Sequence, residues 1–99
     1  MSTPEGTIKK QIRALFLEYG AQVYSSMPVQ NGMGTPMLDF HVCVNGNYLA
    51  VEAKKPTGVL TARQELTKAA IEAAGGTVFR VRDADELEAL RAWLDAHTS

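Results

Sequence analysis

The dipeptide Asn45-Gly46 separates two segments, Leu38–Val44 and Tyr48–Lys54, in which apolar and polar side chains alternate. Asn-Gly is typical of a two-residue β-turn, because both central positions of that turn need a positive φ. Alternation with a period of two indicates strands that bury one face only. The sequence therefore predicts a tight antiparallel hairpin, and this feature limits the possible folds more than any other.

The turn also fixes which residues of the two strands are opposed. With Asn45 and Gly46 at its centre, cross-strand partners have numbers that sum to 91, so Asp39 lies opposite Glu52. Opposed residues share a face, and Lys54 points to the same side as Glu52 because it is two residues further on. A slip of one residue would scatter the apolar set over both faces. In this register that set is Leu38, Phe40, Val42, Val44, Leu49, Val51 and Ala53.

Two opposed carboxylates repel each other unless a cation lies between them. Mg²⁺ and Mn²⁺ prefer oxygen ligands, and one or two carboxylates with water and phosphate oxygens commonly hold Mg²⁺. Asp39 and Glu52 are therefore candidate metal ligands, and the backbone carbonyl of Ala53 is a further one. Lys54 would orient an attacking water or stabilise charge on a phosphate. The alternative is a solvated strand face on which two acids merely flank Lys54.

The other segments carry recognisable ends of helices and strands. Thr3-Pro4-Glu5 begins a helix that runs to about Gly20, and a short strand is expected over Gln22–Met27. Residues 28–36 have the composition of a loop. Thr61 and Gln64 form a capping box that opens a second helix, whose expected inward stripe is Leu66, Ala69, Ala70 and Ala73.

The end of the chain adds one strand and one helix. Gly75-Gly76 ends the second helix, Thr77–Val81 is a strand, and Asp83 caps a last helix that turns Leu87, Leu90, Trp93 and Leu94 inward. The predicted order is α-β-β-β-α-β-α in a single domain over residues 1–99. Three successive strands and a later β-α-β step predict a mixed α/β fold, with a sheet flanked by helices.

Composition and charge narrow the functional classes. The 99 residues are 45% hydrophobic, which excludes a disordered chain, and no apolar run is long enough for a membrane span or a signal peptide. One cysteine excludes an internal disulfide, and a cytoplasmic location is expected. The net charge of −1 hides an excess of basic residues over 52–82 and of acidic residues over 83–99. The basic part can face a polyanion, or the charges are solvated faces of mixed sign.

Several of these features together resemble a VRR-NUC domain of the PD-(D/E)XK nuclease superfamily. The shared features are Gly34-Thr-Pro-Met-Leu-Asp39, Val51-Glu-Ala-Lys54, Gln64 in the following helix, Gly75-Gly76 and the closing strand, so the resemblance covers nearly the whole chain. Met37 and Leu38 separate Pro36 from Asp39, whereas these positions are adjacent in many members. Small members of this kind are stand-alone phage-type proteins.

The resemblance implies metal-dependent hydrolysis of DNA, with the fold of the restriction endonucleases. Asp39 and Glu52 would bind Mg²⁺ or Mn²⁺, Lys54 would be the catalytic lysine, and Gln64 would support the site from its helix. Glu5 matches an acid on the first helix that helps at a second metal or at the water. Small stand-alone members act as homodimers on branched DNA such as four-way (Holliday) junctions.

Basic side chains near these segments are candidate DNA contacts. They are Lys9, Lys10, Arg13, Lys55, Arg63 and Lys68. Two other hypotheses remain open: a non-catalytic DNA-binding or regulatory module on the same fold, and a small α/β interaction domain unrelated to DNA. The complete set of Asp39, Glu52 and Lys54 favours the nuclease, because a degenerate copy would be expected to lose at least one of them.

Overall fold

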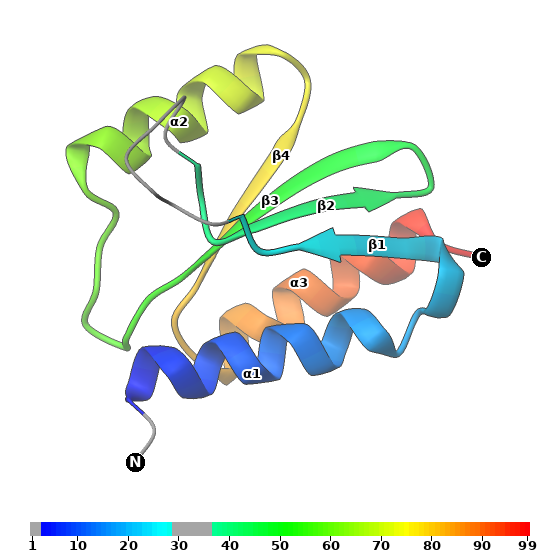
Figure 1. Cartoon of the computed structure of the whole chain (residues 1–99), viewed down its shortest axis with the longest axis horizontal. Helices are drawn as coiled ribbons and strands as arrows, with labels where there is room; N and C mark the ends of the chain where they lie inside the picture. The colour runs from blue at the N-terminus through cyan, green and yellow to red at the C-terminus, as the bar shows by residue number, and fades with distance from the viewer. Residues whose placement is uncertain (1–2, 29–36) are drawn as a thin grey trace.

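The computed structural model describes residues 3–28 and 37–99 as three α-helices, a short 3₁₀ turn and a four-stranded sheet (Figure 1). The first helix, α1, spans Pro4–Leu17 and is capped by Thr3, whose hydroxyl accepts the Gly6 N–H at 2.9 Å. It ends before Gly20, because a 3₁₀ turn over Gly20–Gln22, with Gly20 at φ +58°, carries the chain into the sheet. The Gly34-Thr-Pro36 part of the motif lies outside the described residues.

The four strands lie in the order β1-β2-β3-β4. They are β1 (Val23–Ser26), β2 (Phe40–Val44), β3 (Asn47–Ala53) and β4 (Thr77–Val81). The first three pair antiparallel, and β4 pairs parallel to β3. This confirms the mixed sheet, although β1 begins and ends one residue inside the expected strand and β2 begins two residues later than expected.

The predicted hairpin register is confirmed. His41 pairs with Ala50 and Val44 pairs with Asn47, so opposed residues have the expected sum. Asn45 and Gly46 have φ values of 47° and 87°, as a turn with two positive φ angles requires. The ladder ends at the pair Phe40 and Val51, so Asp39 lies just beyond the end of β2.

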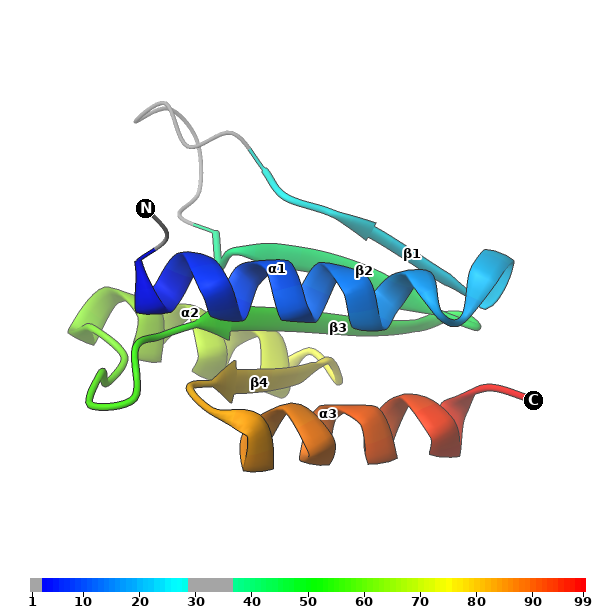
Figure 2. The same cartoon turned by 90° about the horizontal axis from the view of Figure 1, so that it is seen from below.

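The core lies between one face of the sheet and two helices. The helix α3 (Ala84–His97) runs beside α1 on this face, and α2 (Ala62–Ala73) lies near the opposite face (Figures 1 and 2). The buried set contains the predicted strand residues together with Leu90 and Leu94 of α3. From α1 it takes Ile8, Ile12, Leu15 and Phe16. No helix in the described part of the chain is long and apolar enough to span a membrane.

The expected inward stripe of α2 is wrong. Leu66 is 73% exposed, and α2 has no fully buried side chain. The partly buried side chains are Gln64, Thr67, Lys68 and Ile71, which lie two residues, or about half a turn, around the helix from the predicted face. Gln64 and Ile71 make the contacts that position the helix, with Glu52 and with the Gly75-Gly76 turn. The polar contacts at the start of α2 therefore decide which side of the helix faces the sheet, and the predicted stripe of one leucine and three alanines stays exposed.

Candidate active site

Two carboxylates interlock at the end of the hairpin. The backbone N–H of Asp39 donates to Oε1 of Glu52 at 3.0 Å, and the backbone N–H of Ala53 donates to Oδ2 of Asp39 at 2.9 Å. Each side chain thus accepts a hydrogen bond from the opposite strand, beyond the last ladder pair. The tight turn brings the two acids together, as the sequence predicts, and the reciprocal bonds hold them there.

Glu52 is deeply buried for an acid, with 4% of its surface exposed. Its pKa is raised to about 7, first by burial and then by the negative charge of Asp39. The hydrogen bond from the Asp39 backbone and the positive charge of Lys54 oppose this shift, and Glu5 adds to it. The site therefore concentrates negative charge in a place that water reaches poorly, and a cation there would favour the ionised form of Glu52.

Two lysines lie against the carboxylates from different sides. Lys54 Nζ is 3.7 Å from Oε2 of Glu52, and Lys9 Nζ is 3.6 Å from Oδ1 of Asp39. Lys54 comes from the end of β3, whereas Lys9 comes from the second turn of α1. The sequence predicts Lys9 as a DNA contact, and its pairing with Asp39 is seen only in the structure. The available signal was its position one helical turn after Glu5.

Gln64 joins α2 to the buried carboxylate. Its amide nitrogen donates to Oε2 of Glu52 at 2.9 Å, and its amide oxygen accepts the N–H of Thr61 at 2.9 Å. The Thr61 hydroxyl in turn accepts the Gln64 N–H at 3.1 Å, which completes the predicted capping box. The Gln64 side chain thus caps α2 and also binds Glu52, so hydrogen bonds connect the start of the helix to the candidate site.

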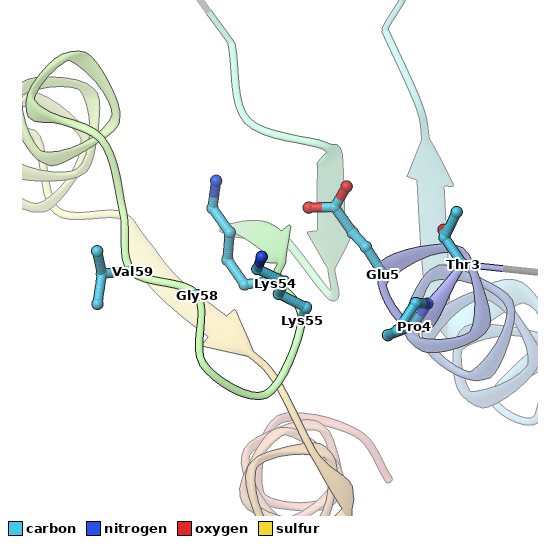
Figure 3. Close-up of a pocket in the computed structure, with 7 residues that line it drawn as sticks. All are labelled: Thr3, Pro4, Glu5, Lys54, Lys55, Gly58 and Val59. Carbon is cyan, nitrogen blue, oxygen red and sulfur yellow. The ribbon is translucent and has the colours of Figure 1, made fainter.

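A cavity of about 500 Å³ opens beside Lys54. Glu5 lies on the α1 side of it, across from Lys54 and Lys55 (Figure 3). Gly58 and Val59, in the loop after β3, line the same side as the lysines. The side chain of Val59 is 68% exposed. This cavity is large enough for a nucleotide-sized group, and it brings Glu5 to the candidate site.

The donor set suits a hard divalent ion that keeps much of its water. Among residues 3–28 and 37–99, no three Asp, Glu, His or Cys side chains are grouped so that they could hold a metal ion. Asp39 and Glu52 supply two carboxylates. The Ala53 N–H points to Asp39, and because the N–H and C=O of one residue in an extended strand share an edge, we expect the Ala53 C=O on the same side. Two carboxylates and a carbonyl fit Mg²⁺ or Mn²⁺, which complete their shells with water and phosphate oxygens.

The remaining predicted DNA contacts are spread over the molecule. Lys55 lines the cavity beside Lys54, and Lys10 and Arg13 are exposed on α1. Arg63 is exposed at the start of α2, and Lys68 forms an ion pair with Glu72 at 3.3 Å. The structure thus brings Lys9 to Asp39 and Lys55 to the cavity beside Lys54, and it leaves Arg63 and Lys68 on the separate surface of α2.

Comparison with solved structures places the fold. The chain superposes on a structure described as a VRR_NUC domain with a TM-score of 0.76 and 21% sequence identity, over 90% of this chain and 95% of that chain. No protein-family model and no curated protein matches the sequence. The predicted fold class, a mixed sheet flanked by helices as in the PD-(D/E)XK nucleases, is confirmed by this likeness.

Proposed function

Because the chain has the fold of a VRR-NUC domain, we propose that it is a divalent-metal-dependent endonuclease that hydrolyses phosphodiester bonds in DNA. The observation that carries the proposal is the hydrogen-bonded pair of Asp39 and the buried Glu52, with Lys54 3.7 Å from Glu52. A fold alone does not determine an activity, so this constellation is the essential support.

In this proposal Asp39, Glu52 and the Ala53 carbonyl hold Mg²⁺ or Mn²⁺. The ion supplies Lewis-acid polarisation of a phosphate oxygen and activation of a water molecule. Lys54 orients that water and stabilises charge that develops on the phosphate. Gln64 keeps Glu52 in place through its 2.9 Å hydrogen bond, and Glu5 faces the water from α1 or supports a second ion.

We further propose branched DNA, such as a four-way junction, as the substrate and a homodimer as the working form. The radius of gyration is 13.0 Å, so one copy offers little surface for a branched duplex. Two copies related by a two-fold axis would present two equal sites, one for each strand to be cut. A phage-type origin and a cytoplasmic place of action accompany this proposal and come from the resemblance and the composition.

Cleavage assays test the function. Asp39→Ala and Lys54→Ala should abolish Mg²⁺- or Mn²⁺-dependent cleavage of branched DNA, while circular dichroism shows a folded protein. Asp85→Ala is the matched control, because it removes an exposed acid from the first turn of α3. Its cleavage rate should equal that of the wild type. Cleavage that survives in either site variant would refute the assignment.

The second candidate is a non-catalytic DNA-binding module on the same fold. The basic groups on α1 and in the loop after β3 favour it as much as they favour a nuclease. It predicts salt-dependent DNA binding without cutting in Mn²⁺. Branched, flapped and linear DNA, each incubated with Mn²⁺ or with a chelator, separate the two functions.

A further inference from the structure

A second cavity, of about 410 Å³, lies between α1 and the end of β1. It offers a guanidinium, two hydroxyls and an apolar rim. The exposed fractions of Leu17 and Met27 are 81% and 41%. The lining residues are Arg13, Leu17, Ser25, Ser26, Met27 and Phe40.

This cavity lies at the same end of the sheet as the two carboxylates. Phe40, which lines it, directly follows Asp39 in the chain. Ser26 pairs with His41 across β1 and β2, so the end of β1 is level with the start of β2. The cavity is therefore adjacent to the candidate active site, one strand away from Glu52.

The helix α1 connects the two cavities past Asp39. Glu5, Lys9 and Arg13 are spaced four residues apart, so each lies about 6 Å further along the helix than the last. Glu5 lines the first cavity, Lys9 is 3.6 Å from Asp39, and Arg13 lines the second cavity. A linear ligand that follows this edge of α1 would pass both cavities with the carboxylates between them.

The chemistry of the second cavity suits a phosphodiester group. Arginine binds phosphate through two parallel N–H bonds, and serine hydroxyls commonly contact DNA phosphates. Within the part of the chain that the structure describes, Arg13 forms no ion pair, so its charge is not already matched by a carboxylate. The apolar side chains of Leu17 and Met27 would cover the adjoining deoxyribose.

We propose that this cavity binds the phosphate and sugar of a nucleotide that flanks the cleaved bond, with Arg13 as the phosphate ligand and Ser25 and Ser26 as further donors. The inference rests on the proposed function and extends it. The substrate strand must continue on both sides of the cleaved bond, since one flank occupies each cavity. The chain is then suited to internal bonds rather than to strand ends.

Binding of labelled DNA, followed by fluorescence anisotropy in EDTA so that no strand is cut, tests this site. Arg13→Gln should weaken binding at least tenfold and should reduce the slope of log affinity against log salt by about one. Arg13→Lys keeps the charge but loses the two-pronged geometry, so it should weaken binding at least about threefold. Ser25→Ala combined with Ser26→Ala should also weaken it. Arg82→Lys, which lies after β4, is the matched control and should bind as the wild type does.

The outcomes distinguish a specific Arg13 site from a general basic surface, and they distinguish failure of this inference from failure of the proposed activity. Wild-type affinity in Arg13→Lys would reduce Arg13 to one charge among several and would overturn the inference, as would wild-type affinity in Arg13→Gln. If the wild type cuts DNA but the Arg13 substitutions leave its affinity for DNA unchanged, this inference is overturned and the proposed activity stands. Binding that depends on Arg13 in a protein that never cuts DNA would refute the proposed activity and leave the contact site standing.

The position of the cut supplies a second readout. After the cleaved bond is mapped, substrates shortened from one end or the other show which flank meets Arg13. The loss of DNA affinity caused by Arg13→Gln should vanish when that flank is removed from the substrate and should persist when the opposite flank is removed. A loss of equal size with both shortened substrates would overturn the assignment of the cavity to one flank.

Discussion

At the scale of single residues, Glu52 is costly to ionise, because it is buried beside a second acid. It is the one buried charged residue among those that the structure describes, and its nearest charged neighbours include a second acid. Proteins rarely bury an acid beside another acid for stability, because both desolvation and repulsion disfavour the ionised form. Such residues are common at functional sites, where a ligand offsets the cost.

This cost predicts a pH dependence of stability in the metal-free protein. The pKa of Glu52 is raised from 4.5 to about 7 in the folded state, so folding favours its protonated form. Its favourable contribution is fully present below pH 4.5 and is lost as pH rises through 7, and it amounts to roughly 3 kcal/mol. Glu52→Gln should remove that loss. In urea unfolding with EDTA at pH 5 to 8, the free energy of unfolding of the variant should increase relative to that of the wild type as pH rises.

Divalent ions supply the control for that experiment. Mn²⁺ should restore wild-type stability at pH 8 and should leave Glu52→Gln nearly unchanged, because the amide is a weaker ligand than the carboxylate. A stability difference between the two proteins that stays constant from pH 5 to pH 8 would contradict the assigned pKa.

At the scale of elements, α2 depends on its first turn more than on its apolar side chains. Thr61 and Gln64 exchange two hydrogen bonds at that turn, and Gln64 also binds Glu52. Leu66, which periodicity placed inward, is exposed. Helical spacing shows that some side of a helix is apolar but does not say that this side faces the sheet. Here the buried carboxylate needs a donor, and Gln64 can reach it only when the helix is rotated away from the leucine.

The cap can be tested by one substitution. Thr61→Ala removes the hydroxyl that accepts the Gln64 N–H, and it should lower the free energy of unfolding by about 1 kcal/mol. It should also reduce cleavage, because Gln64 then holds Glu52 less firmly. Thr61→Ser keeps the acceptor and is the matched control. Urea unfolding and initial cleavage rates check both effects, and an alanine variant as stable as the serine variant would show that the cap contributes nothing.

The turn after α2 tests the close packing of this element against β3. A Cβ at Gly76 would lie 2.6 Å from Cγ2 of Ile71 and 2.9 Å from Cδ2 of Tyr48. Neither atom is at the end of a flexible chain, so Gly76→Ala should destabilise the protein by about 1–3 kcal/mol. Leu66→Gln, on the exposed side of the same helix, should change stability by less than about 0.5 kcal/mol. Thermal unfolding compares the two, and equal midpoints would contradict the packing described for α2.

At the scale of the whole molecule, contacts between α3 and the two residues that directly follow α1 join distant parts of the sequence. The Tyr19 hydroxyl donates to Oδ1 of Asp95 at 2.6 Å, and Arg91 pairs with Glu18 at 2.8 Å. Burial and the bond to Asp95 raise the pKa of Tyr19 to about 12. These polar contacts close the layer of two helices over the core, and they keep α1 in the place from which Lys9 reaches Asp39.

A pair of tyrosine variants tests this closure. Tyr19→Phe should lower the free energy of unfolding by about 1 kcal/mol, because Asp95 loses its hydrogen-bond donor. Tyr24→Phe is the matched control, since the Tyr24 side chain is 70% exposed on β1. In an ultraviolet titration of the wild type, one tyrosine should ionise near pH 12. Equal stability of the two variants would show that the Tyr19 contact does not join the helices.

What the sequence determined by itself is local. Asn45-Gly46 dictates the register, because Asn-Gly favours the two-residue turn in which both central residues have a positive φ, and that register places Asp39, Glu52 and Lys54 together. Caps and glycines likewise show where the helices begin and end, to within a few residues. The rotation of α2, the pairing of Lys9 with Asp39 and the two cavities along α1 were decided only by the tertiary structure. They depend on which donors and charges reach a buried carboxylate from elements far away in the chain, and no periodicity along one element contains that information.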